Sequence, residues 1–476
     1  MKKGHLHFHD GHFQQYLLIF QIVKIEILYE VMPDNEPLIS VGILTAKQIE
    51  FELYGDFQSY GIRKTFSGRF TAELVNDKIV FRQAAERLEV SNEITFEPKE
   101  PRLESFLVKN VIIGNKFHWQ RKENERFIGS LKIIKDNSHI TVINVLPVEN
   151  YLTSVISSEM STKSSIEALK AHAIISRSWL FSQIKRSKTR NEKRKTEYNT
   201  ETEHLKWYDR EEHKLYDVCN DDHCQRYHGI TKVVSGVASQ AIEFTRGIVL
   251  KDGNEICDAR YSKCCGGISE SYENVWEPVK YSYLKPVIDN KYEPENYETD
   301  LTIEENAVRW IKGRPSAFCN TTDKNVLSQI LVDFDQATKN FFRWKVEYNQ
   351  EEISKLIFEK SEIDFGDITD LIPIERGASG RLNKLKIAGT KKTLIVGKEL
   401  EIRKFLSSTH LYSSAIVIDK IGPDNGVPKK FVIHGAGWGH GVGLCQIGAA
   451  VMASKGYMFD EILLHYFSGV KLKNIY

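Results

Sequence analysis

The amino-acid sequence predicts an α+β fold, in which a strand-rich N-terminal portion is followed by a helical segment and a mixed C-terminal lobe. Two successive patterns in the sequence support this prediction. From Glu36 to about Asn144, short β-branched and aromatic runs alternate with turn signals, as in Leu38 to Leu44 and Ser105 to Ile113. After Pro147, apolar residues recur at helical spacing instead. We therefore expect four segments, residues 1–36, 37–146, 147–300 and 301–476.

The middle segment contains two predicted helices separated by a short polar gap. Apolar residues recur at helical spacing from Val148 to Met160 and again from Ile166 to Ile184. Ser165 is expected to cap the second helix, and Glu167 lies in its first turn, where the helix dipole favours a carboxylate. The gap between the two helices places Glu159 at a helix end.

The C-terminal lobe is predicted to alternate helices and strands. Gln350 to Glu359 has helical spacing, and Arg376 to Arg381 contains turn residues. Near the end, a glycine-rich stretch precedes two further helices, at about Cys445 to Lys455 and Phe459 to Phe467. We expect the loop from His434 to Gln446 to close a cleft against the middle segment.

Composition and charge exclude several classes of protein. The chain has 476 residues, of which 41% are hydrophobic, enough for a sizeable core. Its 65 basic and 64 acidic residues give a net charge of +1, so no global field attracts it to nucleic acid. The charged stretch Lys185 to Glu197 has no interleaved aromatic residues and is predicted to be a solvated surface loop. We therefore predict no nucleic-acid partner.

The beginning of the chain shows no convincing secretion signal. Its first residues are polar and rich in histidine, and the apolar run from Tyr16 to Leu28 is interrupted by Lys24 and Glu26. No other segment approaches the roughly 18 uninterrupted apolar residues of a membrane helix, so we predict no transmembrane segment.

The seven cysteines are too few and too uneven for a disulfide scaffold. Two of them lie with two histidines in a twelve-residue stretch, and these four residues, His213, Cys219, His223 and Cys224, match the ligand set of a tetrahedral zinc site. His228 is a possible substitute ligand. Because all four ligands are protein groups, the zinc would be structural. A Cys219–Cys224 disulfide is the alternative, and we favour zinc.

Glu159 is the candidate catalytic residue. A carboxyl group at a helix end beside a polar gap can lie in a cleft, and a partly apolar pocket raises the pKa of such a group enough for it to act as an acid. Most glutamates at helix ends are exposed and structural, so position alone favours the structural interpretation.

The motifs around Glu159 resemble the stage II sporulation protein D (SpoIID) family, which includes the LytB amidase enhancers. In the two helices the matching residues are Tyr151-Leu152, Ser158-Glu159-Met160, Glu167 to Ala171, and Arg177. Outside the helices they are Asn144 to Pro147, Tyr261 with Gly266-Gly267, and the second hallmark from His434 to Ala449. Separate motifs in the same order along the chain are hard to obtain by chance.

This resemblance implies a lytic transglycosylase that cleaves peptidoglycan glycan strands, preferably after their stem peptides have been removed. In that reaction one glutamate protonates the glycosidic oxygen and then accepts a proton from the hydroxymethyl group of the same muramic acid, which closes a 1,6-anhydro ring. Ordinary glycosidases need a pair of carboxylates. The sequence has no second acid in an equally convincing motif. The substrate implies a location in the cell envelope and an amidase as a possible partner.

Six further residues are candidates for substrate binding. The resemblance and the motifs select Arg177, Tyr261, Lys263, His440, Gln446 and Tyr466. Trp438 and Tyr466 can offer aromatic faces to sugar rings, although such aromatics are often part of the core. Cys445 is expected to be an inert buried thiol.

The chain also departs from the family pattern. Ser161, Ser164 and Ser165 stand where the family commonly has proline after the glutamate and a Trp-Pro pair before the helix. Two alternatives to the enzyme remain: a non-catalytic glycan-binding enhancer of an amidase, and a zinc hydrolase acting on the wall peptides.

Overall fold

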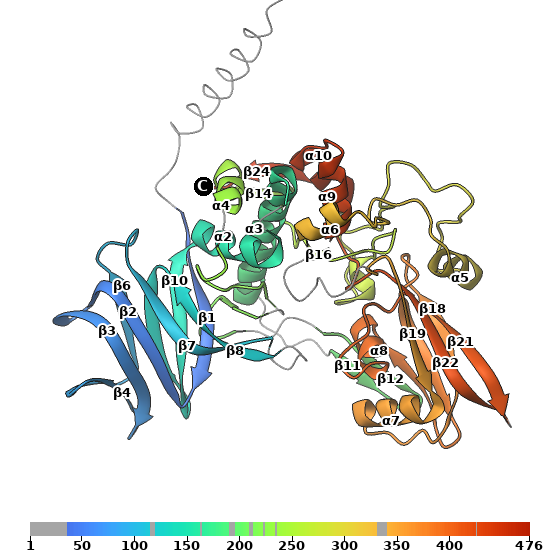
Figure 1. Ribbon diagram of the computed structural model, residues 1–476, viewed down its shortest axis with the longest axis horizontal. Helices are drawn as coiled ribbons and strands as arrows, with labels where there is room; N and C mark the ends of the chain where they lie inside the picture. Colours follow the sequence, from blue (N-terminus) through green and yellow to red (C-terminus); the bar gives the residue numbers. More distant parts are fainter. Residues whose placement is uncertain are drawn as a thin grey trace, which may run out of the picture.

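The computed structural model describes residues 36–476, apart from residues 115–119, 162–163, 190–195, 209–212, 222–223, 234–235, 331–339 and 425. Two β-rich lobes lie side by side, one formed by the N-terminal strands and one by strands from the C-terminal half (Figure 1). Helices α2 (Val148–Glu159), α3 (Ile166–Thr189), α9 (Gln446–Ser454) and α10 (Phe459–Tyr466) lie together at the upper ends of the lobes. The fold is therefore mixed α and β, as predicted.

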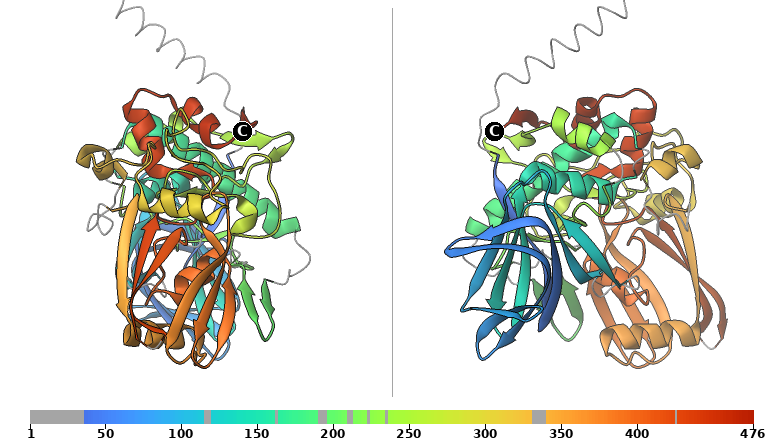
Figure 2. Two further views of the ribbon diagram at one scale, coloured as in Figure 1. Left: turned by 90° about the vertical axis from the view of Figure 1, so that its right-hand side faces the viewer. Right: turned by 60° about the vertical axis from the view of Figure 1, so that its left-hand side comes forward.

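The N-terminal lobe is built from a curved eleven-stranded sheet (Figure 2). Its main path is β13-β1-β10-β9-β6-β2-β3-β4-β5, and β7 and β8 branch from β2. The strands are β1 Leu38–Ala46, β2 Gln48–Ser59, β3 Ile62–Val75, β4 Lys78–Gln83, β5 Glu86–Val90, β6 Glu93–Pro98, β7 Ser105–Ile113, β8 Arg121–Phe127, β9 Ser130–Asp136, β10 His139–Pro147 and β13 Val218–Cys219.

Phenylalanine side chains fill the inner side of this sheet. Phe51 stacks on Phe70 with ring centroids 5.2 Å apart, and Phe66 and Phe81 make edge contacts with Phe96. These residues are buried. Strand alternation therefore directs one apolar face inward and explains why the N-terminal strands were recognisable in the sequence.

Helices α2 and α3 have the predicted positions. Strand β10 leads directly into α2, and α3 begins where the Ser165 hydroxyl accepts the backbone N–H of Ala168 at 3.3 Å. This is the expected cap. Helix α3 continues to Thr189, so the start of the charged stretch at Lys185 is helical and not a loop, which corrects that prediction. Helix α4 (Gly236–Phe244) packs against both helices.

The last residues of the chain return to these helices. Strand β14 (Ile248–Asp252) pairs with β24 (Lys471–Asn474) and with β15 (Glu255–Ile256). Strand β16 (Tyr261–Ser262) runs parallel to β23 (Leu444–Cys445), and α9 follows β23 directly. One hydrophobic core consequently contains residues from the N-terminal lobe, α2, α3, α9 and α10, on both sides of the boundary we predicted at residue 300.

The second lobe has its own core. One sheet has the order β11-β12-β20-β19-β18 and the other β17-β22-β21. The strands are β11 Glu197–Asn199, β12 Glu203–Lys206, β17 Arg343–Asn349, β18 Ile368–Arg376, β19 Leu382–Gly389, β20 Thr393–Gly397, β21 Ile416–Asp424 and β22 Val427–Ala436. Its helices are α7 Gln350–Ser361 and α8 Glu399–Phe405. Helices η1 Tyr272–Asn274 and α6 Lys324–Ile330 contribute to the first core, and α5 Glu304–Lys312 contributes to a smaller third cluster. Helix α7 lies at the end of this lobe farthest from α10 (Figures 1 and 2).

Across the described residues, no helix is both long enough and apolar enough to cross a membrane. The N-terminal stretch to which the question of a secretion signal applies, residues 1–35, lies outside the part of the chain that the structure describes.

Candidate functional site

Glu159 is the last residue of α2. The helix ends because Met160 adopts an extended conformation, with φ −124° and ψ 147°, and this residue is buried. The Glu159 side chain is half-buried, and its Oε1 accepts the backbone N–H of Arg226 at 3.4 Å. Among the described residues, no lysine or arginine forms an ion pair with Glu159. Its carboxylate is thus held by a backbone amide and is not committed to a cation.

A buried network lies next to Met160. The Gln446 side-chain amide donates to Nε2 of His172 at 3.0 Å and approaches Sδ of Met160 at 3.8 Å. The ring of Tyr261 meets the His172 ring edge-on, with centroids 4.6 Å apart. Thus Gln446 and Tyr261, both predicted from the sequence, lie together beside the end of α2.

His172 is a member of this network that the sequence analysis missed. It lies on the inward face of α3, directly after the motif Glu167 to Ala171, and its position on the apolar face was the available signal. Burial and the nearby Lys263 ammonium lower the pKa of His172 to about 3. His172 is therefore neutral at pH 7, which agrees with Nε2 accepting a hydrogen bond from Gln446.

The predicted zinc ligands come together in the loop that precedes Arg226. One ligand atom from each of His213, Cys219 and Cys224 lies within 4.8 Å of the other two, and His213 Nε2 is 3.4 Å from Cys224 Sγ. The fourth predicted ligand, His223, lies outside the described residues. The three described groups fit the nitrogen and sulfur donors of a tetrahedral zinc site.

This loop reaches Glu159 through the two residues after Cys224. Gln225 accepts a hydrogen bond from the Tyr151 hydroxyl on α2 at 3.2 Å, and Arg226 supplies the N–H that meets Glu159. A metal held at Cys224 would therefore fix the backbone that supports the carboxylate. His228 does not belong to this group, because its Nδ1 is bonded to the buried carboxylate of Glu125.

A second potential metal group lies in the core. Ligand atoms of Cys265, Asp289, Cys319 and Cys445 all lie within 4.8 Å of one another, and all four residues are buried. In the sequence, Cys319 and Cys445 each lie far from any other cysteine. The parallel pairing of β16 with β23 is what brings Cys445 to Cys265.

Two predicted substrate-binding residues point elsewhere. The Arg177 guanidinium is fully buried and forms a two-pronged ion pair with Glu149, so it joins α3 to the start of α2. Tyr466 is also buried, and its hydroxyl donates to Asp289 at 2.5 Å. Neither side chain has a free face for a sugar, and both positions indicate structural roles.

The other candidates retain some exposure. Lys263 is half-buried, and its ammonium group lies 3.5 Å from the carbonyl oxygen of Ile330. His440 is half-buried, with Nδ1 accepting the N–H of Val442 at 3.0 Å and its ring 5.2 Å from that of Trp276. The ring of Trp438 stacks on that of Tyr412, with ring centroids 4.0 Å apart.

Comparison with known proteins matches this region to a family. Residues 136–251 match the model described as Stage II sporulation protein, SpoIID. Stage II sporulation protein D of Bacillus amyloliquefaciens is 24% identical over 343 residues, which cover 72% of this chain and 78% of that protein. The Amidase enhancer of Bacillus subtilis is 23% identical over 245 residues, covering 49% of this chain and 32% of that protein. Residues 136–251 thus match the SpoIID family, and the chain is similar to relatives named Stage II sporulation protein D and Amidase enhancer.

Other matches extend beyond the SpoIID segment. An uncharacterized protein of Brachyspira hyodysenteriae is 27% identical over 350 residues, which cover 73% of this chain and 72% of that protein. Residues 270–443 match a domain of unknown function, DUF8618. The SpoIID segment contains Glu159, His172 and the His213–Cys224 loop, whereas Cys265 and Cys445 lie outside both matched segments.

Proposed function

We propose that the protein is a lytic transglycosylase that cleaves the glycan strands of peptidoglycan, preferably strands already stripped of stem peptides. The observation that carries the proposal is the state of Glu159. Its carboxylate ends helix α2 beside the His172–Gln446 network, is half-exposed, and accepts a backbone N–H without an ion pair among the described residues. A carboxyl group in that position can both give and take a proton.

The proposed reaction needs one acid that changes role. Protonated Glu159 gives its proton to the oxygen between muramic acid and the next sugar, and the glycosidic bond breaks. The resulting carboxylate then takes the proton of the muramic acid's own hydroxymethyl group while that oxygen bonds to the anomeric carbon. The products are a 1,6-anhydro end and a free hydroxyl, and Glu159 has regained its proton.

The surrounding residues would position the glycan. Tyr261 begins β16 and Lys263 directly follows the last residue of this strand, where it can meet an anionic or hydroxyl group of the substrate. We also propose that the loop from His434 to Gln446 closes the cleft, because Gln446 reaches α3 from that loop. Since the substrate lies in the cell envelope, we place the protein there.

Replacing Glu159 by Gln tests the proposal. The amide keeps the shape of the side chain but cannot donate and recover a proton, so release of anhydro-muramic products from amidase-treated sacculi should fall by about 10²- to 10⁴-fold. Mass spectrometry of the products is the measurement. The matched control is Glu305→Gln on the exposed side of α5, which should retain full activity. Undiminished anhydro products from Glu159→Gln would remove the acid role.

A second candidate function is that of a glycan-binding enhancer, which the match to a protein named Amidase enhancer favours. The partner would be an N-acetylmuramoyl-L-alanine amidase. In that case the protein alone would release no glycan fragments, and both the wild type and Glu159→Gln would accelerate the amidase on intact sacculi.

A further inference from the structure

We propose that Cys265, Asp289, Cys319 and Cys445 bind a second metal ion, a thiophilic divalent cation such as zinc, in a closed structural site. This site is separate from the His213–Cys224 loop, and the inference does not depend on the proposed glycan cleavage. It rests on the spacing of the sulfur atoms, on the hydrogen bonds that they accept, and on the burial of Asp289 among them.

The sulfur spacing fits a tetrahedral metal site. Cys265 Sγ and Cys319 Sγ are 3.7 Å apart. Two sulfurs at about 2.3 Å from a tetrahedral zinc ion are separated by roughly 3.8 Å, whereas a disulfide bond is about 2.0 Å long. Three thiols and one carboxylate within 4.8 Å of one another supply the four ligands that zinc takes in structural sites.

Backbone N–H groups are already directed at two of the sulfurs. Cys445 Sγ accepts from the N–H groups of Cys265 at 3.3 Å and Gly448 at 3.4 Å, and Cys265 Sγ accepts from Gly267 at 3.4 Å. A neutral thiol is a weak acceptor, while a metal-bound thiolate is commonly oriented by such bonds. Cys445 also caps α9, and a helix N-terminus favours the thiolate form.

Asp289 is a buried carboxylate without a cation. Its two oxygens accept from the Tyr466 hydroxyl at 2.5 Å and the Cys319 N–H at 2.8 Å, and no lysine or arginine of the described residues pairs with it. Burying an uncompensated carboxylate is costly, and a bound divalent cation would remove that cost.

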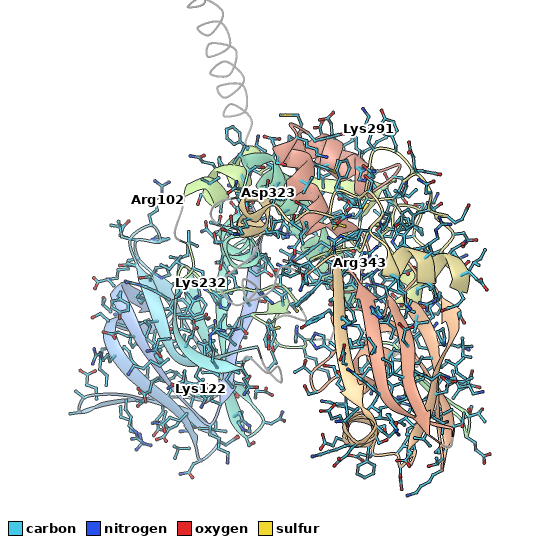
Figure 3. The ribbon with its side chains drawn as sticks, turned by 45° about the vertical axis from the view of Figure 1, so that its right-hand side comes forward. Arg102, Lys122, Lys232, Lys291, Asp323 and Arg343 are labelled. Carbon is cyan, nitrogen blue, oxygen red and sulfur yellow. The ribbon has the colours of Figure 1, made fainter. Side chains whose placement is uncertain are left out.

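Arg343 does not fill this role. Arg343, at the start of β17 (Figure 3), interacts electrostatically with Cys319, but its N–H groups donate to backbone carbonyls, including those of Gly266, Gly313 and Trp310. It thus supplies a fixed positive charge near the sulfurs and leaves the position between the four ligands for the metal.

The site would be closed and structural. Asp289 and Cys445 are 0% exposed and Cys265 and Cys319 are 1% exposed, so no ligand position faces solvent for substrate or for a catalytic water. A Cβ atom at Gly448 would lie 2.3 Å from Asp289 Oδ1 and 2.2 Å from the Tyr466 hydroxyl, so the α9 backbone is packed directly against the acidic ligand.

The four ligands come from chain segments far apart in sequence. Cys265 follows β16, Cys319 lies between α5 and α6, and Cys445 precedes Gln446 at the start of α9. A metal at these ligands would join the end of the chain to the middle segment. It would also hold Gln446 against His172, which is how a buried structural ion can shape the candidate site without entering it.

Metal analysis of the full-length protein tests the proposal. The protein is purified under reducing conditions, and zinc per folded chain is measured by plasma mass spectrometry for the wild type, Cys319→Ser, Asp289→Asn and the control Cys257→Ser. Cys257 is a buried thiol outside both groups. Cys319→Ser should lose one equivalent of zinc and Cys257→Ser none.

Co²⁺ binding distinguishes the core group from the His213–Cys224 loop, and a mild variant reduces the risk that lost binding reflects misfolding. In a Cys219→Ser background, added Co²⁺ should produce thiolate-to-metal absorption and tetrahedral d–d bands, because the core group remains intact. The milder Asp289→Asn should weaken Co²⁺ binding by more than about tenfold. Both outcomes report on metal binding and would stand even if Glu159→Gln proved fully active.

Three results would overturn the proposal. The first is equal zinc content in the wild type and folded Cys319→Ser. The second is a mass two daltons low with Cys265 and Cys319 linked, which would make the pair a disulfide. The third concerns Cys264, whose thiol also interacts with Cys319 and Cys445: loss of metal in Cys264→Ser together with full retention in Asp289→Asn would reject this ligand set.

Discussion

Two metal-ligand groups flank the candidate site, and they are built in opposite ways. The loop group of His213, Cys219 and Cys224 spans twelve residues of chain and ends two residues before the amide that holds Glu159. The core group collects Cys265, Asp289, Cys319 and Cys445 across 180 residues. With metal bound, the first group would position the Glu159 carboxylate, whereas the second would hold Gln446 against His172 and join distant parts of the chain.

The largest expected difference is in stability. Cys445→Ala removes a core ligand and leaves Asp289 and two thiols without compensation, so the free energy of unfolding should fall by about 3 to 5 kcal/mol. Cys219→Ala releases only the loop from His213 to Cys224. It should lower the free energy of unfolding less than Cys445→Ala does, while still reducing glycan cleavage. Urea unfolding and product analysis of both variants are the measurements. Equal loss of stability in the two would show that the groups are not divided in this way.

The same contrast explains what was predictable from sequence. His213, Cys219 and Cys224 were recognised because ligands of a local site keep a readable spacing. Helices α2 and α3 were recognised from their apolar periodicity, and Ser165 from its place before α3. Glu159 needed the family motif in addition, because a carboxylate at a helix end has no distinctive local signal.

The remaining features depend on contacts distant in sequence. Cys445 reaches Cys265 only through the β16–β23 pairing, and neither two-residue strand has a pattern of its own. Arg177 was predicted to contact substrate. Its actual partner, Glu149, lies 28 residues away on another helix and could not be inferred from the sequence. Tyr466 was predicted to offer its ring to a sugar. Its hydrogen-bond partner, Asp289, lies 177 residues away and likewise could not be inferred from the sequence.

His172, which contacts Gln446 and Tyr261, makes the stability of the protein depend on pH. Its pKa of about 3 in the folded protein is depressed from 6.5, so it contributes stability that is present above pH 6.5 and lost as pH falls toward 3. Between pH 7 and pH 5 this loss is about 2 kcal/mol. Protonation would also break its acceptance of the Gln446 amide, with Lys263 opposing the new charge.

Unfolding of the wild type and His172→Gln at pH 7 and pH 5 measures this contribution. The wild type should lose about 2 kcal/mol more than the variant over this range, since glutamine has no charge to gain. An identical pH dependence in the two proteins would mean that His172 is already solvated in the folded state.

The smallest expected effect separates a helix cap from a metal ligand. Ser165 and Cys445 both cap helices at the site: the Ser165 hydroxyl accepts the N–H of Ala168 on α3, and the Cys445 sulfur accepts that of Gly448 on α9. Ser165→Ala should cost about 1 kcal/mol, the usual value for a lost cap. If Cys445 were only a cap, its alanine variant would cost a similar amount, and parallel thermal unfolding of the two variants would give matching shifts. A cost several times larger at Cys445 requires an additional interaction of its sulfur, and among the described residues the other two thiols and Asp289 are the groups through which a shared metal would provide it.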